Sequence, residues 1–308
     1  MPIRVPDNLP ARAVLEKERV SLISETRAVT QDIRPLKVLL LNLMPDKIST
    51  ETQLLRALGT TPLQVDPVFI RTASYKGSNT PTDHLDAFYK TWEDVKHQRF
   101  DALIVTGAPV EQMAFENVLY WSELQEIFDW SRTNVYSSFF ICWGAQAALY
   151  HFHGVNKQDA DSKHFGIYPH SINDLYDPLV AGFDDISHIP VSRHTEIFKA
   201  DVEDKTNLKI HLDSDVTGVC LLSDKEKRQV YMFNHLEYDA ETLKNEYMRD
   251  VNQGLEIDVP HNYFPDDNPQ NKPPVTWRAH RTMLFSNWLN LVYQGTPYNL
   301  EELSEISI

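Results

Sequence analysis

The sequence predicts an α/β protein with three layers, a mainly parallel central sheet with helices on both faces, and an elaborated C-terminal half. Three continuous apolar runs carry this prediction: Lys37–Leu43, Phe100–Thr106 and the run from Val135 that ends at Cys142. Such runs are typical of strands that are covered on both faces. Helix-like segments separate them, and this alternation indicates strand–helix–strand units with parallel strands.

Composition sets the broad class of the protein and excludes others. With 42% hydrophobic and 24% charged residues, the 308-residue chain has the ordinary make-up of a globular protein. Its apolar runs are shorter than the roughly 18 residues of a membrane span, and its N-terminus lacks the apolar core of a signal peptide. We therefore expect a cytoplasmic protein without membrane contact. The net charge of −15 disfavours nucleic acid as a partner.

Cysteine and histidine usage narrows the kinds of site that the chain can build. Cys142 and Cys220 are the only cysteines, which excludes a disulfide framework and a metal site made of thiolates from one chain. The histidines within 151–153 and 164–170 lack the company of further ligands that a zinc site requires. We therefore expect neither a metal nor a bound redox cofactor.

In the N-terminal part of the chain, each expected element has a local reason. Residues 1–34 are polar and interrupted by prolines, and we interpret them as an N-terminal arm with one helix. After the first apolar strand, Ser49 or Thr50 can cap a helix that ends at Gly59. The strand Leu63–Ile70 then completes a strand–helix–strand unit, and its proline favours a sheet edge or a bulge.

The same pattern continues as far as Cys142. A polar loop precedes a helix expected over Leu85–Lys96, and a further helix is expected over Trp121–Arg132. The loops that follow three of the strands would open on one edge of the sheet: 44–50, 107–111 and 142–146. Ligands of parallel sheets bind beyond this edge, where the carboxyl ends of the strands meet.

The second half of the chain is more mixed, with short strands, turns and then two helices around a loop rich in Pro, Asn and Asp. The strands are expected at 164–170, 185–191, 216–222 and 229–233, and the helices at 242–252 and 276–293. The chain has no internal repeat and no low-complexity tract. We therefore interpret residues 35–297 as a single domain and residues 298–308 as a C-terminal tail.

Cys142 stands where a buried strand breaks into a helix, so its side chain would face the ligand edge of the sheet. The positive end of a helix favours a thiolate at such a position. A thiolate nucleophile needs a base, and that base needs an orienting group. His235 ends an apolar strand, and Glu237 would lie on the same face of an extended segment. We therefore expect a Cys142–His235–Glu237 triad.

Each member of this triad also has a structural interpretation. A cysteine that ends an apolar strand more often packs in the core than reacts. The His-x-Glu triplet arises readily by chance, and His235 alone would be a hydrogen-bonded structural histidine. The combination of the His-x-Glu triplet with the strand–Cys–x–Gly–helix element favours a catalytic role over these two structural interpretations.

Longer motifs make the function more specific. FICWGAQA and the later HLE resemble class I glutamine amidotransferases, whose cysteine at a strand–helix turn is paired with His-x-Glu. Trp143 departs from their usual small residue, and the sequence shows no synthetase domain. A narrower resemblance covers about residues 1–297. The motifs LNLMPDK, TGAPVE, ICWGAQAALYHFHG, KHFG, PVSRHTE and FNHLEYD, in this order, are similar to homoserine O-acyltransferases of methionine biosynthesis.

This resemblance implies a ping-pong transfer of an acyl group from an acyl-CoA to the hydroxyl of L-homoserine, the first committed step of methionine biosynthesis. Cys142 would carry the acyl group as a thioester. His235 would deprotonate the hydroxyl, and Glu237 would orient His235. The partners would be small molecules, and a homodimer is compatible with the family.

The resemblance also assigns binding groups. The backbone N–H of Trp143 would be one oxyanion-hole donor, and a second would lie in the loop at Gly107 and Ala108. The substrate contacts fall at the family's corresponding positions: Lys163, Ser192 and Arg249. A guanidinium suits the homoserine carboxylate because it can bind it bidentately. Without the resemblance, we would interpret Arg249 as a solvated helix residue and Ser192 as an ordinary turn residue.

The prediction of the acyl group depends on Glu111, which follows the TGAPV segment. In the family, this position is implied to choose between succinyl and acetyl donors. A carboxylate facing the acyl pocket would oppose a succinyl carboxylate by about 1–4 kcal/mol at a separation of ~4 Å, whereas acetyl is neutral. We therefore expect acetyl-CoA as co-substrate. The alternatives are succinyl-CoA, a thiol hydrolase of the amidotransferase type, a non-catalytic binding protein and, for Glu111, an exposed helix-terminal carboxylate.

Overall fold

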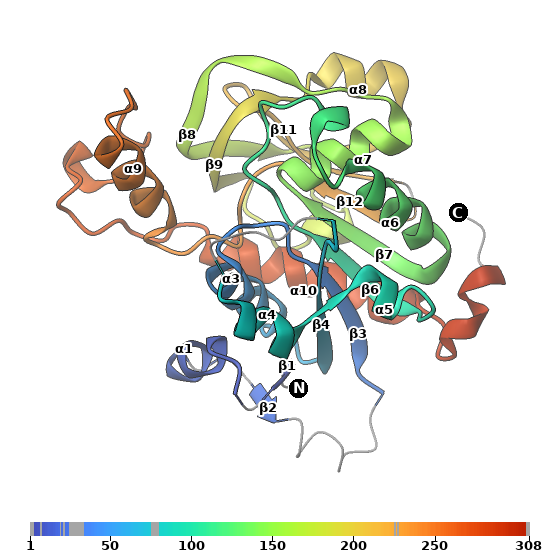
Figure 1. Cartoon of the computed structure of the whole chain (residues 1–308). Helices are drawn as coiled ribbons and strands as arrows, with labels where there is room; N and C mark the ends of the chain where they lie inside the picture. Colours follow the sequence, from blue (N-terminus) through green and yellow to red (C-terminus); the bar gives the residue numbers. More distant parts are fainter. Residues whose placement is uncertain are drawn as a thin grey trace.

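The structure, a computed structural model, describes residues 3–6, 8–18, 20, 22–24, 34–74, 80–224, 226 and 228–305. Within them, twelve strands form one sheet, parallel on one side and antiparallel on the other (Figure 1). The parallel side has the order β2 (Leu22–Ser24), β1 (Ile3–Val5), β4 (Val65–Arg71), β3 (Leu36–Leu41), β6 (Phe100–Val105), β7 (Val135–Ile141) and β12 (Gln229–Met232). The short β5 (Tyr89–Thr91) also pairs with β4.

The antiparallel side continues the same sheet. Its order is β11 (Gly218–Ser223), β10 (Lys209–Ser214), β8 (Gln158–Ile172) and β9 (Ile186–Glu196). At the junction, β12 is parallel to β7 and antiparallel to β11. Met232 is in register with Ile141, so the residues that follow β12 begin beside the end of β7. The sheet topology therefore brings the segment after Met232 close to Cys142.

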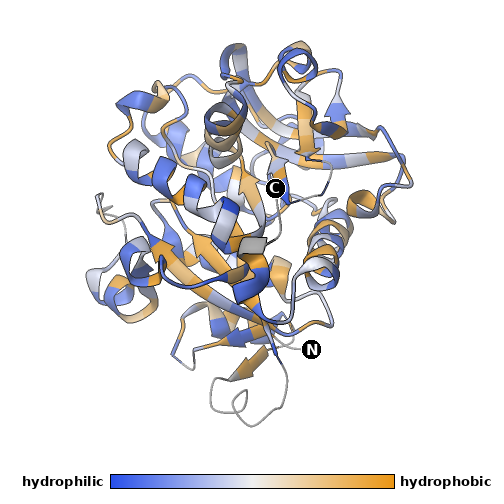
Figure 2. Ribbon diagram, turned by 90° about the vertical axis from the view of Figure 1, so that its right-hand side faces the viewer, coloured by the Kyte–Doolittle hydropathy of each residue, from blue (hydrophilic) through white to orange (hydrophobic). Residues whose placement is uncertain are grey.

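Helices cover both faces of the sheet, and each face has its own hydrophobic core. In β3, Val38 and Leu40 belong to one core and Leu39 and Leu41 to the other, because successive side chains of a strand point to opposite faces. The strands are accordingly the most hydrophobic part of the molecule in Figure 2. The predicted three-layer arrangement is confirmed.

The helices divide between these two cores. The first core takes side chains from α1 (Ala11–Lys17), α3 (Lys47–Leu58), α4 (Thr82–Phe88), α9 (Thr242–Asn252) and α10 (Arg278–Gly295). The second takes them from α5 (Trp92–Val95), α6 (Trp121–Asn134), α7 (Trp143–His153) and α8 (Lys199–Lys205). Short 3₁₀ helices lie at Phe115–Asn117, Pro178–Val180, Pro265–Asp267 and Leu300–Glu305. No helix in the described ranges is long and apolar enough to cross a membrane.

Three local predictions in the first half are wrong. Asp46, not Ser49 or Thr50, caps α3, because its carboxylate accepts a hydrogen bond from the backbone N–H of Ser49 at 3.2 Å. The helix expected over Leu85–Lys96 is broken by β5, whose three residues pair with β4. A capping box between Thr91 and Asp94 then starts α5.

The third difference concerns the proline of β4. Pro67 pairs with Val38 of β3, and β4 lies inside the sheet rather than at its edge. On the other side of β4, β1 pairs at Val65 and β5 from Phe69 onward. The proline therefore sits between two short neighbouring strands, where its missing N–H interrupts no described strand pairing.

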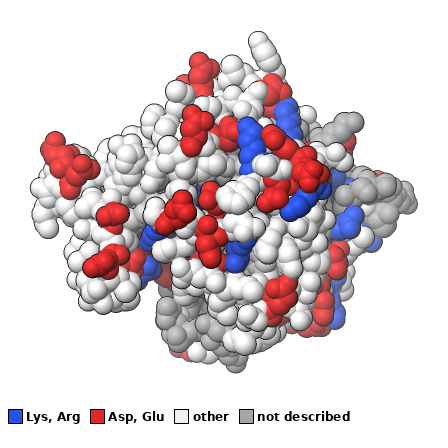
Figure 3. Space-filling model, turned by 90° about the horizontal axis from the view of Figure 1, so that it is seen from above, with Lys and Arg blue, Asp and Glu red and all other residues white. Residues whose placement is uncertain are grey.

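The N-terminal arm contributes to the sheet. β1 lies between β2 and β4, and all three strands are parallel. The rest of the arm at residues 25–33, part of the polar loop at 75–79, and residues 306–308 of the tail lie outside the described residues. In the second half, β10 and α8 are additions to the expected elements, and β8 is much longer than expected. Figure 3 shows acidic side chains spread over the upper face with Lys and Arg among them.

Candidate active site

Cys142 lies at a sharp turn between β7 and α7. Its backbone has φ 51° and ψ −117°, a conformation that costs energy for a residue with a side chain. Its N–H donates to the carbonyl of Met232 at 2.7 Å, and its own carbonyl accepts from Gln146 at 3.1 Å. The turn is thereby fixed from both sides, and it leaves the Cys142 side chain half-buried at the carboxyl edge of the sheet.

A glycine makes this turn possible. A Cβ at Gly144 would lie 2.6 Å from the carbonyl oxygen of Thr106 and 3.0 Å from that of Val105. The first turn of α7 therefore rests directly on the end of β6, which only a residue without a side chain allows. This contact holds Cys142 beside the loop that follows β6.

His235 and Glu237 follow β12 and reach the same edge. The imidazole Nδ1 donates to Glu237 Oε1 at 2.6 Å, and both side chains are buried. The backbone N–H of His235 donates to the carbonyl of Pro190 at 2.9 Å, and the ring of Tyr238 stacks on the imidazole at 4.0 Å. With Nδ1 engaged by the carboxylate, the other ring nitrogen is available to Cys142. The structure thus brings the three expected residues together.

Charge at this site favours a protonated His235. Burial lowers the pKa of the imidazole, but the charges of Cys142 and Glu237 and hydrogen bonds to both outweigh it and hold the pKa well above 6.5. At neutral pH the imidazolium can therefore face the sulfur and later give up its proton. The buried Arg193 interacts electrostatically with this site. Burial lowers the pKa of its guanidinium, and the charge of Cys142 offsets part of that lowering.

The loop after β6 comes very close to Cys142. A Cβ at Gly107 would lie 3.2 Å from the Cβ and 3.7 Å from the Sγ of Cys142, so the Gly107 backbone adjoins the Cys142 side chain. Ala108 follows and is buried. On the other side, Trp143 is the first residue of α7, and the first N–H groups of a helix have no partner within it. Gly107 and Trp143 therefore lie next to Cys142, and Ala108 follows in the same loop, while their role as oxyanion-hole donors stays a prediction.

Trp143 also explains how the chain fills the space that a small residue would leave. Its indole is fully buried and packs against Phe115 at 5.9 Å and edge-on to Tyr120 at 6.1 Å between ring centroids. These aromatic residues belong to the segment that follows the Gly107 loop. The tryptophan thus supports that segment through its packing.

The predicted substrate contacts meet on a residue that the sequence did not indicate. Lys163 Nζ donates to Glu246 Oε1 at 2.7 Å, and Ser192 Oγ donates to the same oxygen at 2.8 Å. Lys163 comes from β8, Ser192 from β9 and Glu246 from α9, so three distant segments converge. The sequence near Glu246 gives one hint of its place in this cluster: it lies three residues before Arg249 on the same helix, so both side chains share one helix face.

Arg249 lies at the rim of this cluster. Its guanidinium contacts Asp250 Oδ1 at 2.6 Å and lies 3.8 Å from Glu246 Oε1. The side chain is 58% exposed, which leaves guanidinium N–H groups open to the solvent side of the site. Arg249 is therefore solvent-exposed, as a residue on a solvated helix face would be. Its guanidinium is nevertheless held in place by the carboxylates of Asp250 and Glu246.

Glu111 bridges the Gly107 loop and β9. Its Oε2 accepts from the backbone N–H of His194 at 2.9 Å and from the hydroxyl of Thr195 at 3.2 Å. Thr195 also hydrogen-bonds Gln146, one helical turn after Cys142. Glu111 is therefore half-buried and tied to the site, and it is not a freely exposed helix-terminal carboxylate.

The pKa of Tyr238 reflects the negative groups that lie near it. Burial raises the pKa of Tyr238, and four groups raise it further: Glu246, Glu237, Cys142 and Glu111. The charges of Glu246, Glu237, Cys142 and Glu111 therefore all act on Tyr238. Among the described residues, no group of three or more His, Cys, Asp or Glu side chains is arranged to hold a metal ion.

Comparison with solved structures agrees with the fold. The glutaminase domain of CTPS from Trypanosoma brucei, solved with bound acivicin, has a TM-score of 0.50 at 12% identity and covers 84% of this chain and 94% of its own. A Thermoplasma acidophilum protein, described provisionally as part of a GMP synthase, has a TM-score of 0.53 at 15% identity, covering 85% and 96%. These values establish a shared fold of the class I glutamine amidotransferase type.

Comparison with sequences is more specific. The homoserine O-succinyltransferase family model matches residues 2–298. A homoserine O-acetyltransferase from Hyphomonas neptunium is 52% identical over 99% of this chain and 100% of its own length. One from Brevibacillus brevis is 53% identical over 97% and 98%. The chain therefore belongs to the homoserine O-succinyltransferase family.

Proposed function

We propose that this protein transfers an acetyl group from acetyl-CoA to the hydroxyl of L-homoserine, giving O-acetyl-L-homoserine and CoA in methionine biosynthesis. The observation that carries the proposal is the approach of Cys142, His235 and Glu237 to one another beside the cluster around Glu246. Relatives of about half-identical sequence, named as homoserine O-acetyltransferases over their full lengths, support the substrate and the acyl group.

In the first half-reaction, the Cys142 sulfur attacks the thioester carbonyl of acetyl-CoA. Backbone N–H groups of Trp143 and of the Gly107 loop stabilise the oxyanion of the tetrahedral intermediate. The intermediate collapses, the carbon–sulfur bond to CoA breaks, and the His235 imidazolium protonates the leaving thiolate. The products are free CoA and an acetyl thioester on Cys142, so one thioester replaces another at little cost.

In the second half-reaction, homoserine enters the same site. Glu246 suits its ammonium group, and Arg249 its carboxylate, because each offers the opposite charge. The neutral imidazole of His235 takes the proton of the hydroxyl as that oxygen attacks the thioester carbonyl, and Glu237 stabilises the imidazolium that results. The bond from carbon to the Cys142 sulfur breaks, and the thiolate–imidazolium pair is restored.

The acetyl donor is supported by the position of Glu111. Its charge acts on the same space as the triad, and Oε2 alone takes both of its hydrogen bonds. A succinyl carboxylate in this space would meet a like charge, which costs about 1–4 kcal/mol at ~4 Å, whereas acetyl meets none. The family model is described by the succinyl reaction, so a comparison of the two donors tests the role proposed for Glu111.

Steady-state rates with acetyl-CoA and succinyl-CoA test the proposal directly. We expect the wild-type protein to prefer acetyl-CoA and Glu111→Gln to narrow this preference by roughly five- to several-hundredfold, since the substitution removes the charge and keeps the size of the side chain. Glu111→Gly also removes the bonds to His194 and Thr195, so it should shift preference further while costing rate with both donors. Preference of the wild type for succinyl-CoA, or hydrolysis of glutamine instead of acyl transfer, would contradict the proposal.

The proposed reaction uses acetyl-CoA as a co-substrate and needs no resident cofactor or metal. Its nucleophile is a free thiol, which a reducing compartment preserves. We therefore place the reaction in the cytoplasm.

A further inference from the structure

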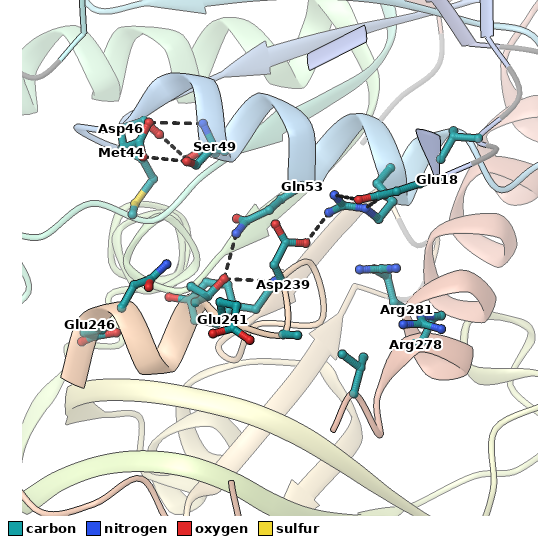
Figure 4. Close-up of a pocket in the computed structure, with 18 of the residues that line it drawn as sticks. Glu18, Met44, Asp46, Ser49, Gln53, Asp239, Glu241, Glu246, Arg278 and Arg281 are labelled. Atoms are coloured by element: carbon teal, nitrogen blue, oxygen red, sulfur yellow. Dashed lines mark hydrogen bonds and ion pairs between the residues drawn. The ribbon is translucent and has the colours of Figure 1, made fainter. Parts of the chain in front are cut away.

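A large groove extends away from the catalytic residues. Its volume is about 1110 Å³, and it lies between α3, the segment after β12, α9 and the start of α10. Figure 4 shows Glu246 at one end of it and Arg278 and Arg281 at the other, with α3 along one wall. Tyr238, which stacks on His235, also lines the groove. The groove therefore leads from the reaction site to a group of arginines.

Arg281 is the most unusual of these arginines. Its side chain is only 5% exposed, and its Nε has no hydrogen-bond partner among the described residues. Burial lowers the pKa of its guanidinium, and the charge of nearby Arg56 lowers it again. A buried donor without a partner costs free energy unless something else accepts its hydrogen bond. Arg281 lines the groove, so an anion there would meet its guanidinium group.

The start of α10 adds further attraction for an anion. Arg278 is the first residue of this 18-residue helix and is exposed beside the groove, with no ion pair to a described residue. Trp277 precedes it and supplies no side-chain cap, so the first N–H groups of α10 have no partner within the helix, and the positive end of the helix dipole lies at Arg278. Such a helix start binds phosphate groups readily.

The local charge balance leaves this end of the groove positive. Arg56 is already paired with Glu18 and Asp239. Two carboxylates, Glu18 and Asp239, thus stand against three arginines at this end: Arg56, Arg278 and Arg281. An anionic ligand here would meet more positive than negative charge, in contrast to the protein as a whole.

The spacing suits a ligand that reaches both ends. α3 has 12 residues and is therefore roughly 18 Å long, which is comparable with an extended pantetheine arm. Trp277 Nε1 donates to the carbonyl of Tyr238 at 2.9 Å, so the start of α10 is fixed to the residue that stacks on His235. By contrast, the pocket beside Val110 and Met113 has only about 150 Å³, too little for a nucleotide.

We propose that Arg278, Arg281 and the N-terminus of α10 bind the phosphates of the acyl-CoA nucleotide, with the pantetheine arm lying along the groove toward Cys142. This inference rests on the proposed function, because it takes acyl-CoA as the donor. It assigns to the far end of the groove the part of the donor that does not react.

The test compares two donors that differ only in the phosphate-bearing end, acetyl-CoA and S-acetyl-pantetheine. In Arg278→Gln and in Arg281→Gln, kcat/KM for acetyl-CoA should fall about ten- to a hundredfold, the scale of a lost charge-assisted contact. The fall should appear mainly in KM, with the KM for homoserine unchanged. With S-acetyl-pantetheine, both variants should match the wild type. Arg132→Gln, which removes an exposed arginine of α6, is the matched control.

Several outcomes would overturn the inference. Equal losses with both donors would mean that the arginines only support the fold, and no loss with either would mean that the phosphates bind elsewhere. Calorimetric titration with adenosine 3′,5′-bisphosphate needs no turnover, so it separates this inference from the proposed function. Binding that weakens in Arg278→Gln supports the site even if the wild type transfers no acetyl group, and binding unchanged in both variants rejects it.

Discussion

His235 is the residue whose protonation links the stability of the fold to its chemistry. Its folded pKa is held well above 6.5 by Cys142 and Glu237 despite burial. Such a group contributes stability that is fully present below its unfolded pKa and is lost as pH rises through the folded pKa. The reason is that, between the two values, the folded protein binds a proton that the unfolded chain has released.

We therefore expect the difference in unfolding free energy between wild type and His235→Gln to be largest near pH 6 and to shrink as pH rises. Each unit of pKa shift corresponds to about 1.4 kcal/mol of this difference. Urea unfolding at a series of pH values would measure it. In a Cys142→Ala background the pH dependence should weaken, since the largest source of the raised pKa is gone. A difference that grows with pH would contradict this assignment to His235.

At the scale of elements, α7 begins directly after Cys142, the proposed nucleophile, and the glycines at its two ends, Gly144 and Gly154, have different surroundings. At Gly144 a Cβ would meet the carbonyl oxygens of Thr106 and Val105, whereas at Gly154 it would meet nothing within 4 Å. Gly154 ends the helix with φ 67°, so its substitution strains only the backbone.

We expect Gly144→Ala to lower kcat at least tenfold and to destabilise the fold by about 1–3 kcal/mol, because α7 must move off β6 and take Cys142 with it. Gly154→Ala should cost about 1–2 kcal/mol through its left-handed backbone and leave kcat nearly unchanged. Thermal unfolding and initial rates on the two variants would separate these effects. Equal kcat losses in both would show that the position of Cys142 does not depend on the contact with β6.

The same scale shows what the sequence could predict. The buried strands can be predicted locally, because a strand covered on both faces is a continuous run of apolar residues. The turn at Cys142 can be predicted in the same way, because an apolar run changes there into a helix-forming run. The segment 85–96 was mispredicted because β5 is extended only through its pairing with β4. Glu246 could not be found for a similar reason, since its partners Lys163 and Ser192 come from a hairpin far away in the sequence. Tertiary contacts decide both features.

At the scale of the whole molecule, the proposed reaction uses one sheet edge for both substrates. β7 brings Cys142 to this edge and β12 brings His235, because the two strands are parallel neighbours. The groove that reaches Arg281 is also lined by Glu246 and Arg249. The sulfur of CoA and the hydroxyl of homoserine must therefore reach the same imidazole nitrogen. Since one nitrogen cannot serve both at once, the two substrates should react in turn.

A shared edge of this kind predicts an exchange that needs no homoserine. When acetyl-CoA is mixed with labelled CoA, the wild-type protein should move the label into acetyl-CoA, because the Cys142 thioester forms and reverses. Cys142→Ala should show no exchange. Glu246→Gln should keep the exchange and raise the KM for homoserine by about tenfold or more, since its carboxylate matters only in the second half-reaction. Exchange that appears only after homoserine is added would mean that both substrates bind together before any bond is broken, and it would contradict the proposed ping-pong order.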